Sequence, residues 1–394
     1  MQINTSVLVK SLVIFLVLNA FFYFFVTNFS DKVPFNKYNY LYNAHHFLQD
    51  NRVHGKDENL LRALGQFDAQ WYLKIASDGY SLNTSNRDLN NKATMEGLTY
   101  GFFPLYPISI HFLNIAVKNT EISAFLLSNI LICLNFLSLI FVVSKLFNQK
   151  VAIKCAFLLL LFPFGIFFRS YYAENLFLLL LIWFSYFFLQ NKYVLAGLLL
   201  GLINVTRGNA YFVDILFASF LTKDLFKRKI NFLRYVFTLS LICLPFFIWI
   251  YFNFIRTGNG LYFFGNQSQW FAADNIFSPL LNNLNALLSV FHLPFHTFHN
   301  SKVDVLTTFI FGILIWRSKK VLPKKLWLVS LLIWLLPLLV KDTMSLSRYQ
   351  GVNFPVFVYL ATKLNDKSFV VVSSIFYLAL LLVGIYFINW YWVG

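Results

Sequence analysis

The sequence predicts an all-α protein that crosses a membrane many times. Hydrophobic residues occupy 58% of its 394 positions and charged residues only 12%, which leaves too little polar surface to enclose soluble domains. The apolar residues form continuous runs of about 15 to 23, close to the length that a helix needs to cross a bilayer. Runs of this kind exclude an outer-membrane barrel, whose strands alternate apolar and polar residues.

The runs predict about eleven crossings. The first, about Val7 to Val26, has no small-residue cleavage site and exceeds a signal-peptide core, so we expect a retained helix that starts, near Lys10, in the cytoplasm. The later runs cover residues 121–144, 152–168, 174–190, 193–205, 208–222, 233–255, 303–316, 326–340, 352–362 and 368–390.

Charge in the short connectors sets the expected orientation, because Lys and Arg resist translocation. Sixteen of them lie in alternate connectors, against only Asp224 and Asp366. These connectors should therefore be cytoplasmic, and they account for most of the +16 net charge without a nucleic-acid partner. The basic residues are Lys145, Lys150, Lys154, Lys192, Lys223, Lys227, Arg228, Lys229, Arg234, Arg317, Lys319, Lys320, Lys324, Lys325, Lys363 and Lys367.

Two longer polar stretches should lie outside, on a single membrane domain that covers residues 1–394. The first extracytoplasmic loop is expected at 30–120 and the second at 256–302. Within the first, the apolar run 102–117 contains two prolines, so we expect a juxtamembrane or re-entrant helix there. The run 193–222 should be split at Arg207 and Gly208, since one long helix would bury Arg207 near mid-span and invert every later loop.

Asp68 is the first candidate catalytic residue. Positions 61, 64, 68, 71, 72 and 75 fall on one helical face, and all except Asp68 are Leu, Trp, Tyr or Ile. A carboxylate on an apolar face is costly unless it is paired or chemically used, which suits a general base at the membrane surface. The alternative is a helix N-cap after Gly65. Asp78 before Gly79 is interpreted as a turn or helix C-cap.

Glu174, Arg207 and Arg348 are further candidates, because each lies at the expected outer end of a helix. Glu174 has a simpler explanation in favourable alignment with the helix dipole. For both arginines, the simpler explanation is that the side chain snorkels toward water. The inferred topology nevertheless places all three on the same side as Asp68.

Other possible sites are weaker. The stretch 256–302 is rich in amides and aromatics and includes Trp270, which could stack on a sugar or belong to an interfacial aromatic belt. We expect no metal at His292, His296 and His299, because Pro294 interrupts their helical spacing. No Asp-x-Asp pair is present to hold a divalent ion on a nucleotide-sugar diphosphate. The three cysteines lie inside apolar runs and suggest neither disulfides nor a metal site.

Five ordered motifs resemble those of the PIG-V mannosyltransferases. They are Phe67-Asp68-Ala69 leading to Gly79-Tyr80, Phe103-Pro104-Leu105-Tyr106-Pro107, Tyr172-Ala173-Glu174-Asn175, Arg207-Gly208-Asn209, and Arg348-Tyr349 with Pro355. The chain departs from the family in having Phe67 where Trp commonly precedes the acid, and Gly208-Asn209 where Ser-Asn-Gly is usual.

The resemblance implies a GT-C type membrane glycosyltransferase, a mannosyltransferase similar to those of glycosylphosphatidylinositol-anchor synthesis. It would use a polyprenyl phosphate sugar as donor and no cofactor or metal, and would act on a glycolipid or lipid-linked acceptor. The chemistry of the residues fits this reaction independently of the resemblance: Asp68 could be the general base, and Arg207 and Arg348 could bind the donor phosphate. Glu174 could orient the acceptor or the neighbours of Asp68. Further candidate substrate contacts are Tyr172, Asn209 and Trp270. The protein would lie in the cell membrane of a prokaryote or the endoplasmic reticulum of a eukaryote.

Two other functions stay open. A transporter or flippase of lipid-linked saccharide would also place charges at the membrane edge, although its usual signs, mid-helix acids and matched broken helices, are not visible. An O-antigen-type polymerase or ligase would also use polyprenyl-linked sugars and outward loops.

Overall fold

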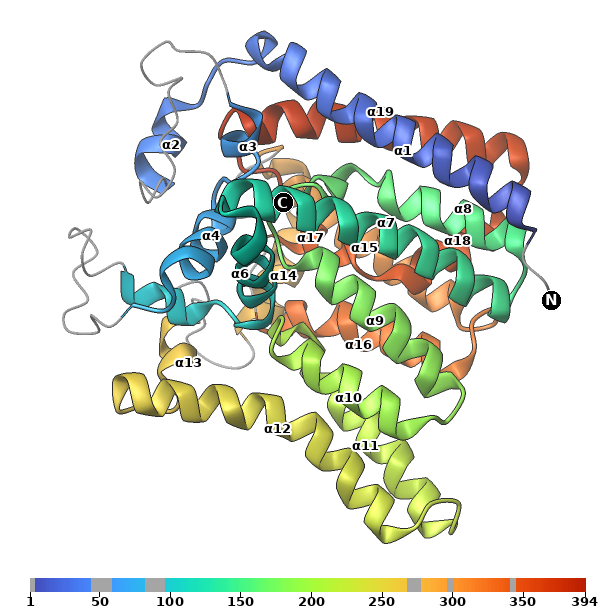
Figure 1. Cartoon of the computed structure of the whole chain (residues 1–394). Helices are drawn as coiled ribbons and strands as arrows, with labels where there is room; N and C mark the ends of the chain where they lie inside the picture. Colours follow the sequence, from blue (N-terminus) through green and yellow to red (C-terminus); the bar gives the residue numbers. More distant parts are fainter. Residues whose placement is uncertain (1–3, 44–58, 82–95, 268–277, 296–300, 341–344) are drawn as a thin grey trace.

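The protein is helical throughout the part that the computed structural model describes, residues 4–43, 59–81, 96–267, 278–295, 301–340 and 345–394, and this part contains no strand (Figure 1). The α-helices are α1 (Thr5–Asn28), α2 (Lys37–Asn43), α3 (Leu60–Ala63), α4 (Asp68–Asp78), α6 (Leu105–Val117), α7 (Thr120–Leu146), α8 (Gln149–Leu160), α9 (Glu174–Leu189), α10 (Tyr193–Asn204), α11 (Tyr211–Phe226), α12 (Phe232–Thr257), α13 (Tyr262–Gln267), α14 (Ser278–Leu288), α15 (Lys302–Ser318), α16 (Lys324–Val340), α17 (Leu346–Gly351), α18 (Phe354–Lys363) and α19 (Asp366–Ile388). Short 3-10 helices include η1 (Ser30–Lys32), η3 (Glu96–Gly101), η4 (Pro163–Phe168), η5 (Gly208–Ala210) and η7 (Val290–His292).

Among the residues that the structure describes, four helices are long and apolar enough to cross a membrane: α1, α7, α12 and α19, with 24, 27, 26 and 23 residues. The expected helical, membrane-embedded class is confirmed at this level. Each of the other expected runs also contains a helix, but these helices have only 10 to 17 residues. The number of crossings therefore stays a prediction.

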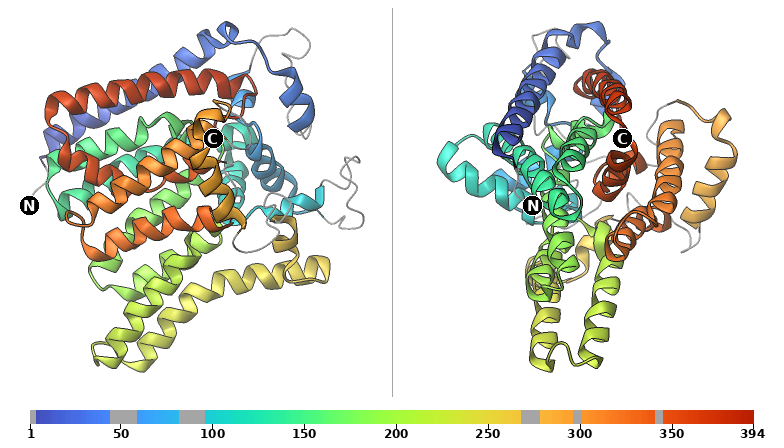
Figure 2. Two further views of the ribbon diagram at one scale, coloured as in Figure 1. Left: turned by 180° about the vertical axis from the view of Figure 1, so that it is seen from behind. Right: turned by 90° about the vertical axis from the view of Figure 1, so that its right-hand side faces the viewer.

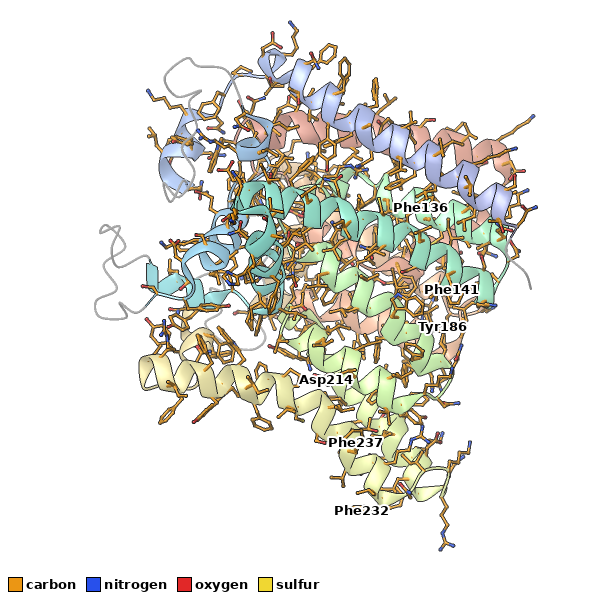
Figure 3. All side chains as sticks on the ribbon, viewed as in Figure 1. Phe136, Phe141, Tyr186, Asp214, Phe232 and Phe237 are labelled. Carbon is orange, nitrogen blue, oxygen red and sulfur yellow. The ribbon has the colours of Figure 1, made fainter. Side chains whose placement is uncertain are left out.

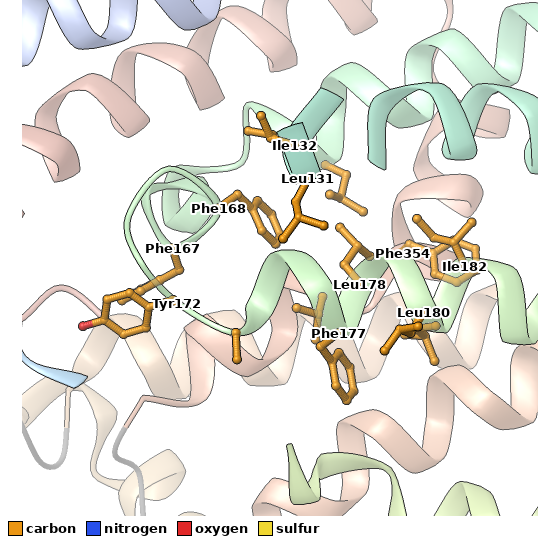
Figure 4. Close-up of a cluster of buried hydrophobic side chains, with 14 of the residues drawn as sticks. Leu131, Ile132, Phe167, Phe168, Tyr172, Phe177, Leu178, Leu180, Ile182 and Phe354 are labelled. Carbon is orange, nitrogen blue, oxygen red and sulfur yellow. The ribbon is translucent and has the colours of Figure 1, made fainter. Parts of the chain in front are cut away.

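The longer helices lie side by side in one bundle, seen from behind and along its length in Figure 2. The α11–α12 hairpin projects from it and ends near Phe232, whose side chain is exposed (Figure 3). The core is built from Phe, Leu and Ile of many elements. Figure 4 shows Leu131 from α7, Phe168 from η4 and Leu178 from α9 close to one another in it.

Two glycines let α10 and α12 approach closely. A Cβ on Gly197 would lie 2.9 Å from Thr238 Cγ2, and one on Gly201 would overlap the Leu241 carbonyl oxygen. Small residues four apart allow this backbone contact between membrane helices, where apolar burial gives little drive for association.

Two pairs of basic connectors make contact toward the end of the bundle that carries the N-terminus in Figure 1. There Lys150 and Lys154 contact Asp366 at 2.7 and 2.9 Å. A second contact is a hydrogen bond of 2.7 Å from Lys325 Nζ to Asn191 Oδ1. Connectors that were expected on one side of the membrane thus lie together in space.

Two details differ from the expected helices, whereas the run 102–117 holds a short helix, as expected. Residues 61 and 64 do not share a helix with Asp68, because α3 ends at Ala63 and α4 begins only at Asp68. The run 152–168 is not one helix, since Pro163, which lacks an N–H and disfavours helix before it, separates α8 from η4. In the run 102–117, α6 begins at Leu105 and measures only about 20 Å, too short to cross a bilayer alone.

Candidate functional site

Four charged side chains from distant parts of the chain form one cluster. Arg348 Nη1 lies 2.7 Å from Asp68 Oδ2, although 280 positions separate the two residues. Arg348 Nε and Arg207 Nη1 both contact Glu174 Oε1. The order is therefore Asp68, Arg348, Glu174, Arg207. The four residues whose common location was inferred from topology do meet.

The exposed fraction of the side chain differs sharply among these four residues. The side chains of Glu174, Arg348 and Arg207 are 1%, 3% and 9% exposed, whereas that of Asp68 is 31% exposed. The two carboxylates balance the two guanidinium charges, which offsets the cost of burying them. Asp68 is thus the accessible end of an otherwise buried ion-pair network.

Aromatic rings hold both guanidinium groups. The Arg348 guanidinium lies 4.5 Å from the ring centroid of Tyr172 and 4.9 Å from that of Phe167, and Arg207 lies 4.7 Å from Tyr349. Such cation-π contacts favour the charged group in a buried setting. The Tyr172 hydroxyl donates to the Gln66 carbonyl oxygen at 3.0 Å, so Tyr172 also joins the site to the residues before α4.

Local backbone features place the acidic residues. Phe67 occupies the N-cap position of α4 with φ 52°, and Asp68 is the first residue of the helix. The N-cap interpretation of Asp68 is therefore wrong, because its carboxylate pairs with Arg348 instead. At the other end, Gly79 caps α4 with φ 78°, which confirms the C-cap interpretation of Asp78 and Gly79. Glu174 opens α9, where the helix dipole also favours its charge.

Arg207 lies in the expected break between helices. α10 ends at Asn204, Arg207 is extended with φ −159°, and η5 follows. Asp214 of α11 accepts from Asn204 Nδ2 at 3.0 and 3.2 Å and so joins the helices on either side of the break (Figure 3). In the sequence, Asp214 could have been noticed as an acidic residue inside an apolar run.

Asp304 was not singled out from the sequence, yet it supports the site. Its carboxylate is buried and accepts hydrogen bonds from Ser347 N at 2.7 Å and Ser347 Oγ at 2.5 Å. It therefore holds the start of α17, the helix that carries Arg348. In the sequence, the Ser301-x-x-Asp304 pattern before an apolar run indicates only the start of a helix. It gives no sign that Asp304 also binds the distant Ser347.

Burial raises the pKa of Tyr72 in α4, and the four charged groups of the cluster also act on this tyrosine. Its hydroxyl therefore stays protonated. Its ring packs against those of Phe102 and Tyr106, with centroids 5.2 and 5.1 Å away. Tyr72 is one more uncharged hydrogen-bond donor near the cluster that sequence reasoning did not identify.

The remaining expected site residues are less defined. Asn209 lies in η5 beside Arg207, but its side chain is outside the described residues, as is Trp270. In the second loop, Asn266 is buried and donates to the Gly97 carbonyl at 2.9 Å, and Asn283 donates to the Pro279 carbonyl at 2.8 Å. These two amides support the fold and do not line an open saccharide site.

His, Cys, Asp and Glu are the side chains that commonly bind metal ions in proteins. Within the described ranges, no three of them come together in a way that could hold an ion. His292 is exposed at the end of η7, and His296 and His299 lie outside those ranges. Comparison with models of protein families, with curated proteins and with solved structures finds no match.

Proposed function

We propose that this protein is a membrane glycosyltransferase that moves a sugar, mannose by the motif resemblance, from a polyprenyl phosphate donor to a glycolipid or lipid-linked acceptor. The observation that supports it most is the accessible Asp68 carboxylate, paired at 2.7 Å with an arginine of a buried two-arginine cluster. A base and a cationic phosphate site are the two elements that this transfer requires.

The reaction is written as an inverting displacement. The acceptor oxygen bonds to the anomeric carbon while the bond from that carbon to the phosphate oxygen breaks. Asp68 takes the proton of the acceptor hydroxyl, and the departing polyprenyl phosphate takes the bonding electrons. Arg348 and Arg207 stabilise the charge that develops on the phosphate, as planar guanidinium groups can without a metal ion.

Glu174 is assigned to positioning the arginines. Its side chain is 1% exposed and one of its oxygens contacts both guanidinium groups, so it orients them from the buried side. These contacts use two nitrogens of Arg348 and one of Arg207, which leaves further N–H groups for a phosphate. The ring of Tyr172 packs against the Arg348 guanidinium. Asn209 and Trp270 remain proposed substrate contacts.

The proposal includes a GT-C type arrangement with eleven crossings and a site on the extracytoplasmic side. It is supported by the location of the cluster and the basic connectors at opposite ends of several helices. α9, for example, begins at Glu174 in the cluster and ends at Leu189, next to the basic connector around Lys192. The membrane would be the cell membrane of a prokaryote or the endoplasmic reticulum of a eukaryote.

The test is transfer by purified protein in lipid nanodiscs supplied with radiolabelled polyprenyl phosphate mannose and mixed lipid acceptors. Asp68→Asn should lower the transfer rate by about 10² to 10⁴, the usual contribution of a general base, while the protein elutes as a folded species. The matched control is Asp78→Asn at the other end of α4, where the side chain is 56% exposed, forms an ion pair with Lys74 and accepts a hydrogen bond from Ser77 Oγ.

Normal turnover of Asp68→Asn would remove Asp68 from the mechanism. Movement of unchanged donor across vesicles, without sugar transfer, would support a flippase instead. Growth of a polymer on the donor lipid would support a polymerase.

A further inference from the structure

The residue before the candidate base has an unusual backbone conformation. Phe67 has φ 52° and ψ −122°, although a residue with a bulky side chain strongly prefers negative φ. Such a conformation persists only where the surroundings hold it. Since Asp68 follows directly, a change of φ at Phe67 would turn the Asp68 carboxylate away from Arg348.

The segment that follows α19 supplies those surroundings. The Phe67 ring lies 5.0 Å from the ring of Trp390, 5.0 Å from that of Trp392 and 6.1 Å from that of Phe387. In addition, Gln66 Nε2 donates to the Ile388 carbonyl oxygen at 2.8 Å. Both residues that lead into α4 are thus held by the chain around and after the end of α19.

The same segment also touches the arginine side of the ion pair. Trp392 lies 6.2 Å from Phe167, one of the two rings beneath the Arg348 guanidinium. A Cβ on Gly394 would lie 3.3 Å from Arg348 Cβ, so this residue packs against the stem of the arginine. Residues 389–394, which we call the strap, therefore contact both partners of the Asp68–Arg348 pair through their neighbours.

The strap is itself anchored to the chain just after α1. The backbone N–H of Asn36 donates to the Asn389 carbonyl at 2.9 Å, and Asn39 Nδ2 donates to the Trp390 carbonyl at 3.0 Å. Asn389 Nδ2 donates to the Ser30 carbonyl at 2.8 Å. These bonds fix the strap independently of the rings that it presents to Phe67.

We propose that the strap positions the Asp68 carboxylate, with Trp392 as a positioning residue that holds the strained Phe67. This inference rests on the proposed transferase function, and Trp392 itself does not touch substrate. A base displaced by about 1 Å can lose up to about 10² in rate, so a small backbone change at Phe67 is sufficient to matter.

The experiment compares Trp392→Ala with Trp392→Phe, which keeps an aromatic ring, and with Trp316→Ala, a tryptophan of α15 that is 73% exposed. Deuterium uptake at residues 66–71 is measured by mass spectrometry in nanodiscs, together with kcat and KM for transfer from polyprenyl phosphate mannose. Trp392→Ala should speed uptake at 66–71 and lower kcat by up to about 10² at unchanged KM. Trp392→Phe should restore both, and Trp316→Ala should change neither.

Unchanged uptake at 66–71 in Trp392→Ala would overturn the inference, and so would faster uptake with normal kcat. If Trp392→Ala does not fold, Trp392→Leu, which keeps most of the apolar volume, takes its place with the same two criteria. If wild-type protein transfers no sugar, the proposed function fails, whereas the uptake comparison still decides whether the strap holds the start of α4.

Discussion

Glu174 is the counter-charge that the two buried arginines of the site share. One of its oxygens contacts both arginines, while Oε2 is buried without a hydrogen-bond partner among the described residues. A buried charge is tolerated when it is paired, and removal of one partner leaves the other uncompensated. Glu174 therefore decides whether two guanidinium groups can lie together in the interior.

Glu174→Gln should destabilise the protein by about 3 to 5 kcal/mol, because it keeps the shape of the side chain but leaves both arginines without a buried counter-charge. Thermal unfolding in detergent, followed by size-exclusion chromatography, measures the loss. The control is Glu121→Gln in α7, whose ion pair with Arg62 is long, at 4.0 Å, and partly exposed. Adding Arg207→Gln to Glu174→Gln should recover part of the stability, and equal stability of wild type and Glu174→Gln would contradict this role.

At the scale of elements, the site depends on helices that end at particular residues. α10 stops before Arg207, α17 begins where Asp304 binds Ser347, and α4 begins after the positive φ of Phe67. Each charged side chain is thus presented from a helix end or a break, where the backbone can turn it toward the others. A continuous helix through residues 193–222 would not place Arg207 beside Glu174.

α10, the helix that ends before that break, packs closely against α12. Gly201→Val should weaken this contact, because a Cβ at this position overlaps the Leu241 carbonyl and a branched side chain must push α12 away. We expect a loss of about 1 to 3 kcal/mol in unfolding free energy, measured by chemical denaturation in mixed micelles. Leu198→Val, which changes a residue of the same helix with an exposed side chain, is the control. Equal destabilisation by both would exclude the close contact as the cause.

In the molecule as a whole, the basic connectors and the candidate site lie toward opposite ends of the helix bundle. Lys150, Lys154 and Asp366 meet at the end that carries the N-terminus, whereas α2, α4 and α13 lie toward the opposite end in Figure 1. Positive connectors on one side are the usual determinant of membrane orientation. The candidate site at the start of α4 and α9 is expected on the other side.

Single cysteines should report this orientation. In a variant without Cys133, Cys155 and Cys243, a cysteine at Asp78 should react with an impermeant maleimide from outside sealed cells. A cysteine at Lys319 should react only after the membrane is opened. Both positions lie in or next to polar connectors, so their reactivity depends on which side of the membrane they face and not on burial within the protein. Labelling of both from the same side would contradict the topology and with it the extracytoplasmic site.

Sequence pattern alone was enough to locate most of the helices and to single out four of the charged residues in the site. Apolar runs locate the helices because burial in lipid or core depends on each residue's own surface, and Asp68, Glu174, Arg207 and Arg348 are conspicuous because charge is costly in such surroundings. The three-dimensional packing was needed to show that these four contact one another, that Asp304 holds α17 and that Trp392 packs on Phe67. Those contacts join residues far apart in the chain, and local pattern carries no information on which distant side chains the packing of helices brings within hydrogen-bonding distance.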